Sequence, residues 1–205
     1  MDPRSTLNTM VALMTATVWV AGAVPPTQPT PLAMDTARVT ITGTSNVHNY
    51  SAWTDTVRVT RVKLGPGVQA ETVWDDVVKP GGLEAFEVAI PVGTLTSRDA
   101  GLDRQMYEAL KADANRDIVF RLKQLEQGPT GLLLAIGKVR IAGVEREVVV
   151  PLQVQRRDET LIVRGRLPLL MTDFGITPPT AMLGILKTDP KVMVTFDVEL
   201  AVPRT

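Results

Sequence analysis

Apolar and polar residues alternate with a period of two through most of the chain from Arg38 onward. This pattern is typical of β-strands that bury one face and expose the other. The clearest example lies near the end of the chain, with apolar residues at Val192, Val194, Phe196, Val198 and Leu200. About eight such segments, most of them separated by short turns, predict a mainly β fold: an antiparallel eight-stranded, lipocalin-like barrel. A two-sheet sandwich is the alternative architecture for the same pattern.

Within this pattern, the alternation slips by one position between Val59 and Val62, which predicts a β-bulge. One short helix is expected after Thr96 and Ser97, where apolar residues from Leu102 to Leu110 recur at helical spacing. The helix would either plug one mouth of the barrel or form a lid over a ligand entrance.

A second interruption, residues 173–189, is too long for a hairpin turn and unusually apolar for a loop. An apolar loop must pack on something, so we expect it near the mouth, against the barrel or against its cargo.

The N-terminal segment has the features of an export signal. Arg4 precedes an apolar run, Met10–Ala23, that ends in the small residues Ala21-Gly22-Ala23. The run is short for a membrane-spanning helix and matches the core of a signal peptide. We therefore expect a cleaved signal peptide over 1–23, a Pro-rich spacer over 24–33 and the folded domain over 34–202. An uncleaved anchor, or a helix of the fold, is the alternative for this segment. The expected location is periplasmic or secreted, with no transmembrane segment in the mature protein.

Composition excludes several functional classes. Lys plus Arg and Asp plus Glu are both 22, so the formal charge is zero and a nucleic-acid partner is not expected. The chain has no cysteine and one histidine, His48, which leaves little for a metal site or a nucleophilic triad. We therefore expect no cofactor, no metal and no catalytic residues. An enzyme with His48 as acid or base remains an alternative.

The interior of an eight-stranded barrel is either filled by side chains or holds one ligand. Aromatic residues make up only 4% of the chain, and the inward candidates are mainly Val, Leu and Ile, which favours an apolar tunnel over a filled core. Burial of methylene groups would then bind a long hydrocarbon without specific polar contacts. The residues expected to line the tunnel are Phe86, Val88, Ile90, Met106, Phe120, Leu122, Leu134, Ile136, Val163, Leu167, Val194 and Phe196.

Two further candidate ligand contacts, His48 and Tyr50, lie in a stretch rich in hydrogen-bonding groups that follows the first predicted strand. The stretch would either hold a polar head group at the mouth or form a turn network that satisfies backbone groups. The turn network is favoured because residues of these types commonly form turns.

Four short motifs, in order and at their spacing, resemble the YceI-like family, the polyisoprenoid-binding, lipocalin-like barrels of bacteria. They are Gly43-Thr44-Ser45 with His48, Ser97–Tyr107 leading into Asn115–Phe120, the hairpin Ile141–Val148, and Asp173–Ile176. Ala142 and Glu145 depart mildly from the family's usual hairpin. The resemblance implies a periplasmic or secreted barrel that holds an isoprenoid or similar amphiphile, for sequestration or transport in the cell envelope. It implies no reaction, and a homodimer is one assembly that the sequence allows.

Overall fold

The computed structural model describes residues 31–181 and 186–203, and strands dominate it. One antiparallel sheet runs in the order β3-β4-β6-β7-β8-β9-β11-β1-β2-β5, and β10 pairs only with β11. The strands are β1 (Ala33–Ser45), β2 (Asn49–Thr54), β3 (Arg58–Leu64), β4 (Leu83–Pro91), β5 (Thr96–Ser97), β6 (Asp117–Gln127), β7 (Leu133–Ile141), β8 (Val144–Arg157), β9 (Thr160–Leu170), β10 (Thr180–Ala181) and β11 (Leu186–Ala201). The helices are α1 (Val73–Asp76) and α2 (Ala100–Ala109), and short 3-10 turns are η1 (Ala70–Thr72), η2 (Val92–Thr94), η3 (Pro129–Gly131) and η4 (Met171–Phe174).

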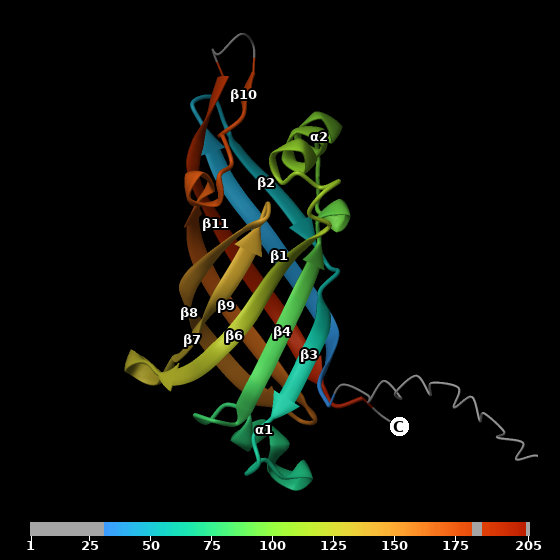
Figure 1. Cartoon of the computed structure of the whole chain (residues 1–205), viewed down its shortest axis with the longest axis vertical. Helices are drawn as coiled ribbons and strands as arrows, with labels where there is room; N and C mark the ends of the chain where they lie inside the picture. Colours follow the sequence, from blue (N-terminus) through green and yellow to red (C-terminus); the bar gives the residue numbers. More distant parts are fainter. Residues whose placement is uncertain (1–30, 182–185, 204–205) are drawn as a thin grey trace, which may run out of the picture.

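The sheet curls around the long axis of the molecule into a half-barrel, with α1 at one end and α2 and β10 at the other (Figure 1). The predicted mainly β, antiparallel fold is confirmed, but the count of eight strands is wrong, because ten strands follow one another along the sheet. Strand β2 was missed because its polar start resembles a turn, and β5 has only two residues. Within the described residues, the outermost strands β3 and β5 are not paired with each other, so hydrogen bonds do not close the curl.

β-Bulges in β3 and β6 affect which residues of these strands face inward. The register of β3 against β4 shifts between Val59 and Arg61, which confirms the predicted bulge. A second shift, in β6 between Leu122 and Gln124, places both Leu122 and Leu125 on the inner face. A bulge adds one residue to one strand, so the inward parity changes beyond it.

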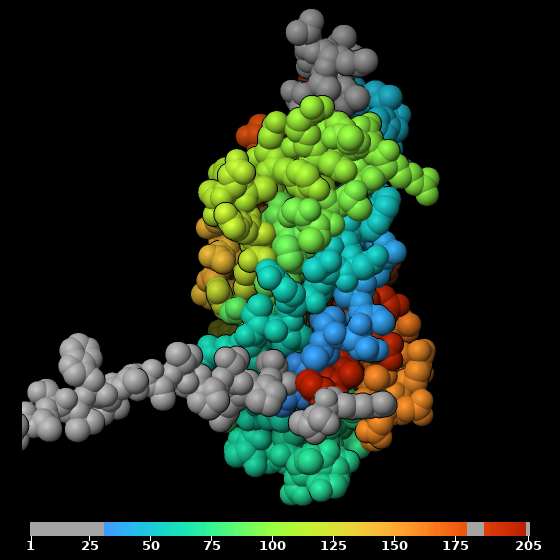
Figure 2. Space-filling view, turned by 90° about the vertical axis from the view of Figure 1, so that its right-hand side faces the viewer, coloured from blue at the N-terminus to red at the C-terminus, as the bar shows by residue number. Residues whose placement is uncertain are grey.

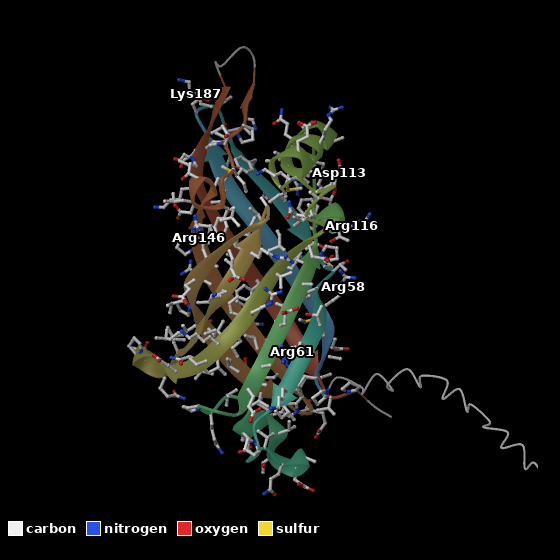
Figure 3. The ribbon with its side chains drawn as sticks, in the orientation of Figure 1. Arg58, Arg61, Asp113, Arg116, Arg146 and Lys187 are labelled. Carbon is white, nitrogen blue, oxygen red and sulfur yellow. The ribbon has the colours of Figure 1, made fainter. Side chains whose placement is uncertain are left out.

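Charged side chains cover the outside of the curl, as Arg58, Arg116 and Arg146 illustrate (Figure 3). Ion pairs link neighbouring strands there, and Arg164 of β9 lies 2.6 Å from Asp197 of β11. Because both partners are exposed, such a pair contributes little stability on its own, and its main effect is to favour this register.

The sheet end at α1 is closed by the β3–β4 connection, residues 65–82. Gly65 N donates to Gly82 O across 2.9 Å, which draws the two ends of this segment together. Its apolar residues Val73, Trp74 and Val77 are buried in a cluster with Leu161, Leu200 and Leu32. The expectation of a single helix is therefore wrong. Helix α1 has only four residues, too few for its period to stand out.

The predicted helix is α2, and it lies at the opposite end from α1 (Figures 1 and 2). It begins after Asp99, whose side chain accepts hydrogen bonds from Gly101 N at 2.7 Å and Leu102 N at 3.3 Å. Asp99 is thus the N-cap. Thr96 and Ser97, expected as the cap region, instead form β5 against β2.

The apolar segment after β9 packs on the barrel. Phe174 of η4 and Ile176 are buried in a cluster with Leu95 and Ile141. This agrees with the first of the two expectations for the 173–189 segment. Residues 182–185 lie outside the described part of the chain, as do the predicted signal peptide and most of the predicted spacer. Among the described residues, no helix is long and apolar enough to cross a membrane.

Candidate ligand-binding cavity

The curl of the sheet encloses a cavity of about 1620 Å³. This exceeds the roughly 300–1,000 Å³ of pockets that hold drug-sized ligands. The inward side chains of β11 show that the interior is open: Val194 and Phe196 point inward and line the cavity, yet they are only half-buried. Their remaining surface faces the cavity rather than packed side chains.

All but two of the fourteen candidate site residues lie on the cavity wall. Those on the wall are His48, Tyr50, Phe86, Val88, Ile90, Met106, Phe120, Leu122, Val163, Leu167, Val194 and Phe196. They come from five strands and α2, together with the turn between β1 and β2. Their contact with a ligand stays a prediction.

The placement of Leu134 and Ile136 on the wall is wrong. Strand β7 turns Leu133, Ala135 and Val139 inward, so Leu134 and Ile136 face outward. There they pair with Pro151 and Val149 of β8. Because residues 132–134 are three leucines, the hydrophobic pattern at the start of this strand does not decide which alternate residues face inward.

Sequence reasoning omitted several wall residues. Some follow from the same alternation on strands that were recognised, and Leu125 was hidden by the bulge in β6. The omitted residues include Ile41, Leu125, Ala135, Val139, Val150, Leu152, Leu169, Val192 and Val198.

The wall changes in polarity along the cavity. Near α1 it is formed by apolar residues of strand ends and of the closing segment, such as Leu133, Leu161 and Val77. Polar residues line the other end, at the β1–β2 turn, the start of α2 and the start of β11. They are Ser45, His48, Asn49, Ser97, Asp99, Gln105, Thr188, Asp189 and Lys191. The arrangement suits an amphiphile with its hydrocarbon deep in the cavity and its polar group at this end, which we call the mouth.

The mouth contains the turn that carries His48. The hydroxyl of Ser45 accepts from His48 N at 3.1 Å and from Val47 N at 3.3 Å, and it donates to His48 O at 2.8 Å. The stretch therefore forms the turn network that residue types favoured. The His48 side chain is exposed at the mouth, and no hydrogen bond of its imidazole is found among the described residues.

Tyr50 lies below this turn, on the inner face of β2. Burial, and then the nearby carboxylate of Asp189, raises the pKa of the Tyr50 hydroxyl above its ordinary value. The phenol is therefore protonated at neutral pH and can donate a hydrogen bond to a ligand head group.

The described residues offer no metal centre. Across 31–181 and 186–203, no group of three or more His, Asp or Glu side chains lies close enough together to hold an ion.

A model of the YceI-like domain matches residues 33–200, which covers every strand of the sheet except the last residue of β11. The chain belongs to the YceI-like family. No match to a curated protein was found.

Solved structures show the same YceI-like fold. The Burkholderia cenocepacia protein BcnA superposes with a TM-score of 0.61 at 16% identity, over 80% of this chain and 95% of BcnA. A polyisoprenoid-binding domain from Saccharophagus degradans, implicated in plant cell wall breakdown, gives 0.61 at 12% identity over 85% of this chain and 99% of that domain. The Campylobacter jejuni YceI protein gives 0.55 at 15% identity, over 75% of this chain and 85% of that protein. At these identities the likeness concerns the fold.

Replacing His48 in this YceI-like protein should have a small effect. We expect His48→Gln to fold and to take up lipid with an affinity within about ten-fold of wild type, the worth of one hydrogen bond. The reason is that the turn depends on Ser45 and on backbone groups rather than on the imidazole. Binding of a fluorescent isoprenoid to both proteins measures this, with ligand recovered and checked for conversion. Turnover by wild type that His48→Gln abolishes would instead support an enzyme, for which an acid–base group contributes roughly 10²–10⁴-fold.

Proposed function

We propose that this protein binds a long apolar amphiphile, an isoprenoid or a similar lipid, inside the half-barrel. The observation that carries the proposal is the cavity of about 1620 Å³, apolar at the α1 end and polar at the mouth. The fold is shared with a domain described as polyisoprenoid-binding, which supports the same ligand class.

Apolar burial is sufficient to drive such binding. Each methylene moved from water to an apolar wall contributes about 0.8 kcal/mol, so ten of them contribute ~8 kcal/mol before the costs of association. The deep wall presents Val, Leu, Ile and Phe side chains, which can make these contacts without polar recognition. Selectivity for the ligand would then rest on the cavity's length and width and on the polar mouth.

The biological role that we propose is sequestration or transport of this lipid in the cell envelope, outside the cytoplasm. The apolar run Met10–Ala23 and its small-residue end support export. We expect the mature protein to begin at or near Val24 and to be recovered from the periplasm or the medium. N-terminal sequencing of the accumulated protein tests this, and a soluble protein that keeps Met1 would contradict it.

Native mass spectrometry of protein purified without detergent tests lipid binding directly. We expect an adduct with the mass of an isoprenoid or another lipid, which is lost on denaturation and recovered by organic extraction. If the protein carries no adduct and takes up none when mixed with polyprenols, the lipid-binding proposal is wrong.

A further inference from the structure

Three aromatic rings of the cavity wall lie against glycines of neighbouring strands. A Cβ atom built on Gly165 of β9 would lie 2.4 Å from Cζ of Phe196, its partner on β11. One built on Gly137 of β7 would lie 2.7 Å from Cζ of Phe120, on β6, and closer still to the backbone oxygen of Arg121 on the same strand. These separations are shorter than real Cβ contacts, so each ring occupies the space that a side chain would need.

The third ring belongs to Tyr50 at the mouth. A Cβ on Gly43 of β1 would lie 2.2 Å from Oη of Tyr50, its partner on β2. We call the three pairs Gly43–Tyr50, Gly137–Phe120 and Gly165–Phe196 the ring seats.

Backbone conformation does not explain these glycines. The described glycines with positive φ are Gly81, Gly131, Gly143 and Gly175, all outside the ring seats. Gly43, Gly137 and Gly165 have ordinary strand geometry, where glycine is less favourable than residues with a side chain. An aromatic ring from the next strand that packs over such a glycine compensates the loss of strand stability that the glycine causes. A ring therefore fills the space above each of the three Cα atoms, and at Gly137 the backbone of Arg121 also approaches closely.

The ring seats also affect the cavity. Phe120 and Phe196 are on its wall, whereas Gly137 and Gly165 are not, because the rings cover them. A ring that packs over a glycine Cα lies against the sheet and leaves the centre of the cavity free. If a methyl group occupied that position, the ring would have to turn toward the centre of the cavity.

We propose that the ring seats determine the width of the cavity, and that they keep it wide enough for a methyl-branched apolar chain. The inference rests on the proposed function and deepens it by naming residues that select the cross-section of the ligand. A narrower cavity would still admit a thin, unbranched chain. The width of the cavity would therefore determine whether it accepts isoprenoid-like ligands as well as straight-chain lipids.

The test uses Gly165→Ala, because the three atoms nearest a Cβ there all belong to the Phe196 ring. Solanesol is the branched probe and stearyl alcohol the unbranched one. We expect this variant to bind solanesol roughly thirty-fold more weakly, the effect of losing two to three buried methylene groups, and to change little for stearyl alcohol. The matched control is Gly93→Ala, because a Cβ there meets nothing within 4 Å and Gly93 is exposed. This control should bind both alcohols as wild type does.

A rescue variant distinguishes ring displacement from a general need for glycine in this strand. Gly165→Ala combined with Phe196→Leu removes the clash and should recover solanesol binding. If the single variant does not fold, the double variant should fold. A double variant as impaired as the single one would overturn the inference.

The possible failures are distinguishable. Wild-type protein that binds neither alcohol would overturn the proposed function and the ligand selection that depends on it. Wild-type protein that binds solanesol, with a Gly165→Ala variant that binds it equally well, would overturn only the inference about width. A readout that needs no ligand is the ¹H chemical shift of Gly165 Hα, which the Phe196 ring should move upfield and which Phe196→Leu should return toward its ordinary value. An unshifted Hα in wild type would contradict the ring seat.

Discussion

Val194→Trp should abolish lipid binding. Val194 lies within the inner face of β11, between Ile41 of β1 and Leu167 of β9, and all three line the cavity. It is only half-buried, so an indole has room to extend inward without displacing a packed core. The ring would obstruct the passage from the mouth to the deep wall. Loss of about four methylene contacts corresponds to a decrease in affinity of more than roughly 100-fold.

Val149→Trp is the matched control for this substitution. Val149 lies on the outer face of β8 and is 52% exposed, so its indole would remain outside the cavity. We expect it to keep the adduct in native mass spectrometry and the affinity for solanesol, whereas Val194→Trp loses both. Circular dichroism should show both variants folded. Undiminished binding by a folded Val194→Trp would mean that the ligand does not occupy the cavity.

Trp74→Ala should cost ~3–5 kcal/mol of unfolding free energy, as expected for an aromatic residue removed from a packed cluster. The Trp74 side chain is 3% exposed and packs beside Val73 and Val77, in the segment that closes the α1 end. Its loss would leave a void next to Leu161 and Leu200, which belong to the same cluster. Urea denaturation followed by circular dichroism measures the change.

Trp74→Phe is the informative comparison, because the Trp74 Nε1–H is buried without a hydrogen-bond partner among the described residues. A phenyl ring keeps much of the apolar contact and removes this unsatisfied donor. We expect it to cost less than about 2 kcal/mol. If Trp74→Phe destabilises as much as Trp74→Ala, the indole nitrogen has a partner in solution and the cluster is not purely apolar.

The sequence predicted best those strands in which alternation is uninterrupted. In β11, the alternating residues Val192, Val194, Phe196, Val198 and Leu200 all face inward as expected. The inward face of β7 could not be recognised in the same way, because in its middle the small residues Ala135 and Gly137 face inward while Leu134 and Ile136 face outward. Gly137 is explained only by the neighbouring strand β6, where the Phe120 ring and the Arg121 backbone lie against it.

The mouth illustrates a second limit of sequence reasoning. Its polar residues come from three separate segments: the β1–β2 turn, the start of α2 and the start of β11. Local patterns identified His48 and Tyr50 but could not bring Asp189 beside Tyr50, because that contact depends on the pairing of β1 with both β2 and β11. Strand pairing between distant segments follows from the whole sheet rather than from local composition.

The position of the first and last strand residues has a practical consequence. Ala33 of β1 pairs with Ala201 of β11, and Leu32 is buried in the same cluster as Trp74 at the α1 end. The C-terminal end of the chain emerges at this end, far from α2 and β10 (Figure 1). A C-terminal affinity tag would therefore hold the protein on a resin with its mouth directed toward the solution. Immobilised in this orientation, the protein could be exposed to a total lipid extract and used to isolate its own ligand.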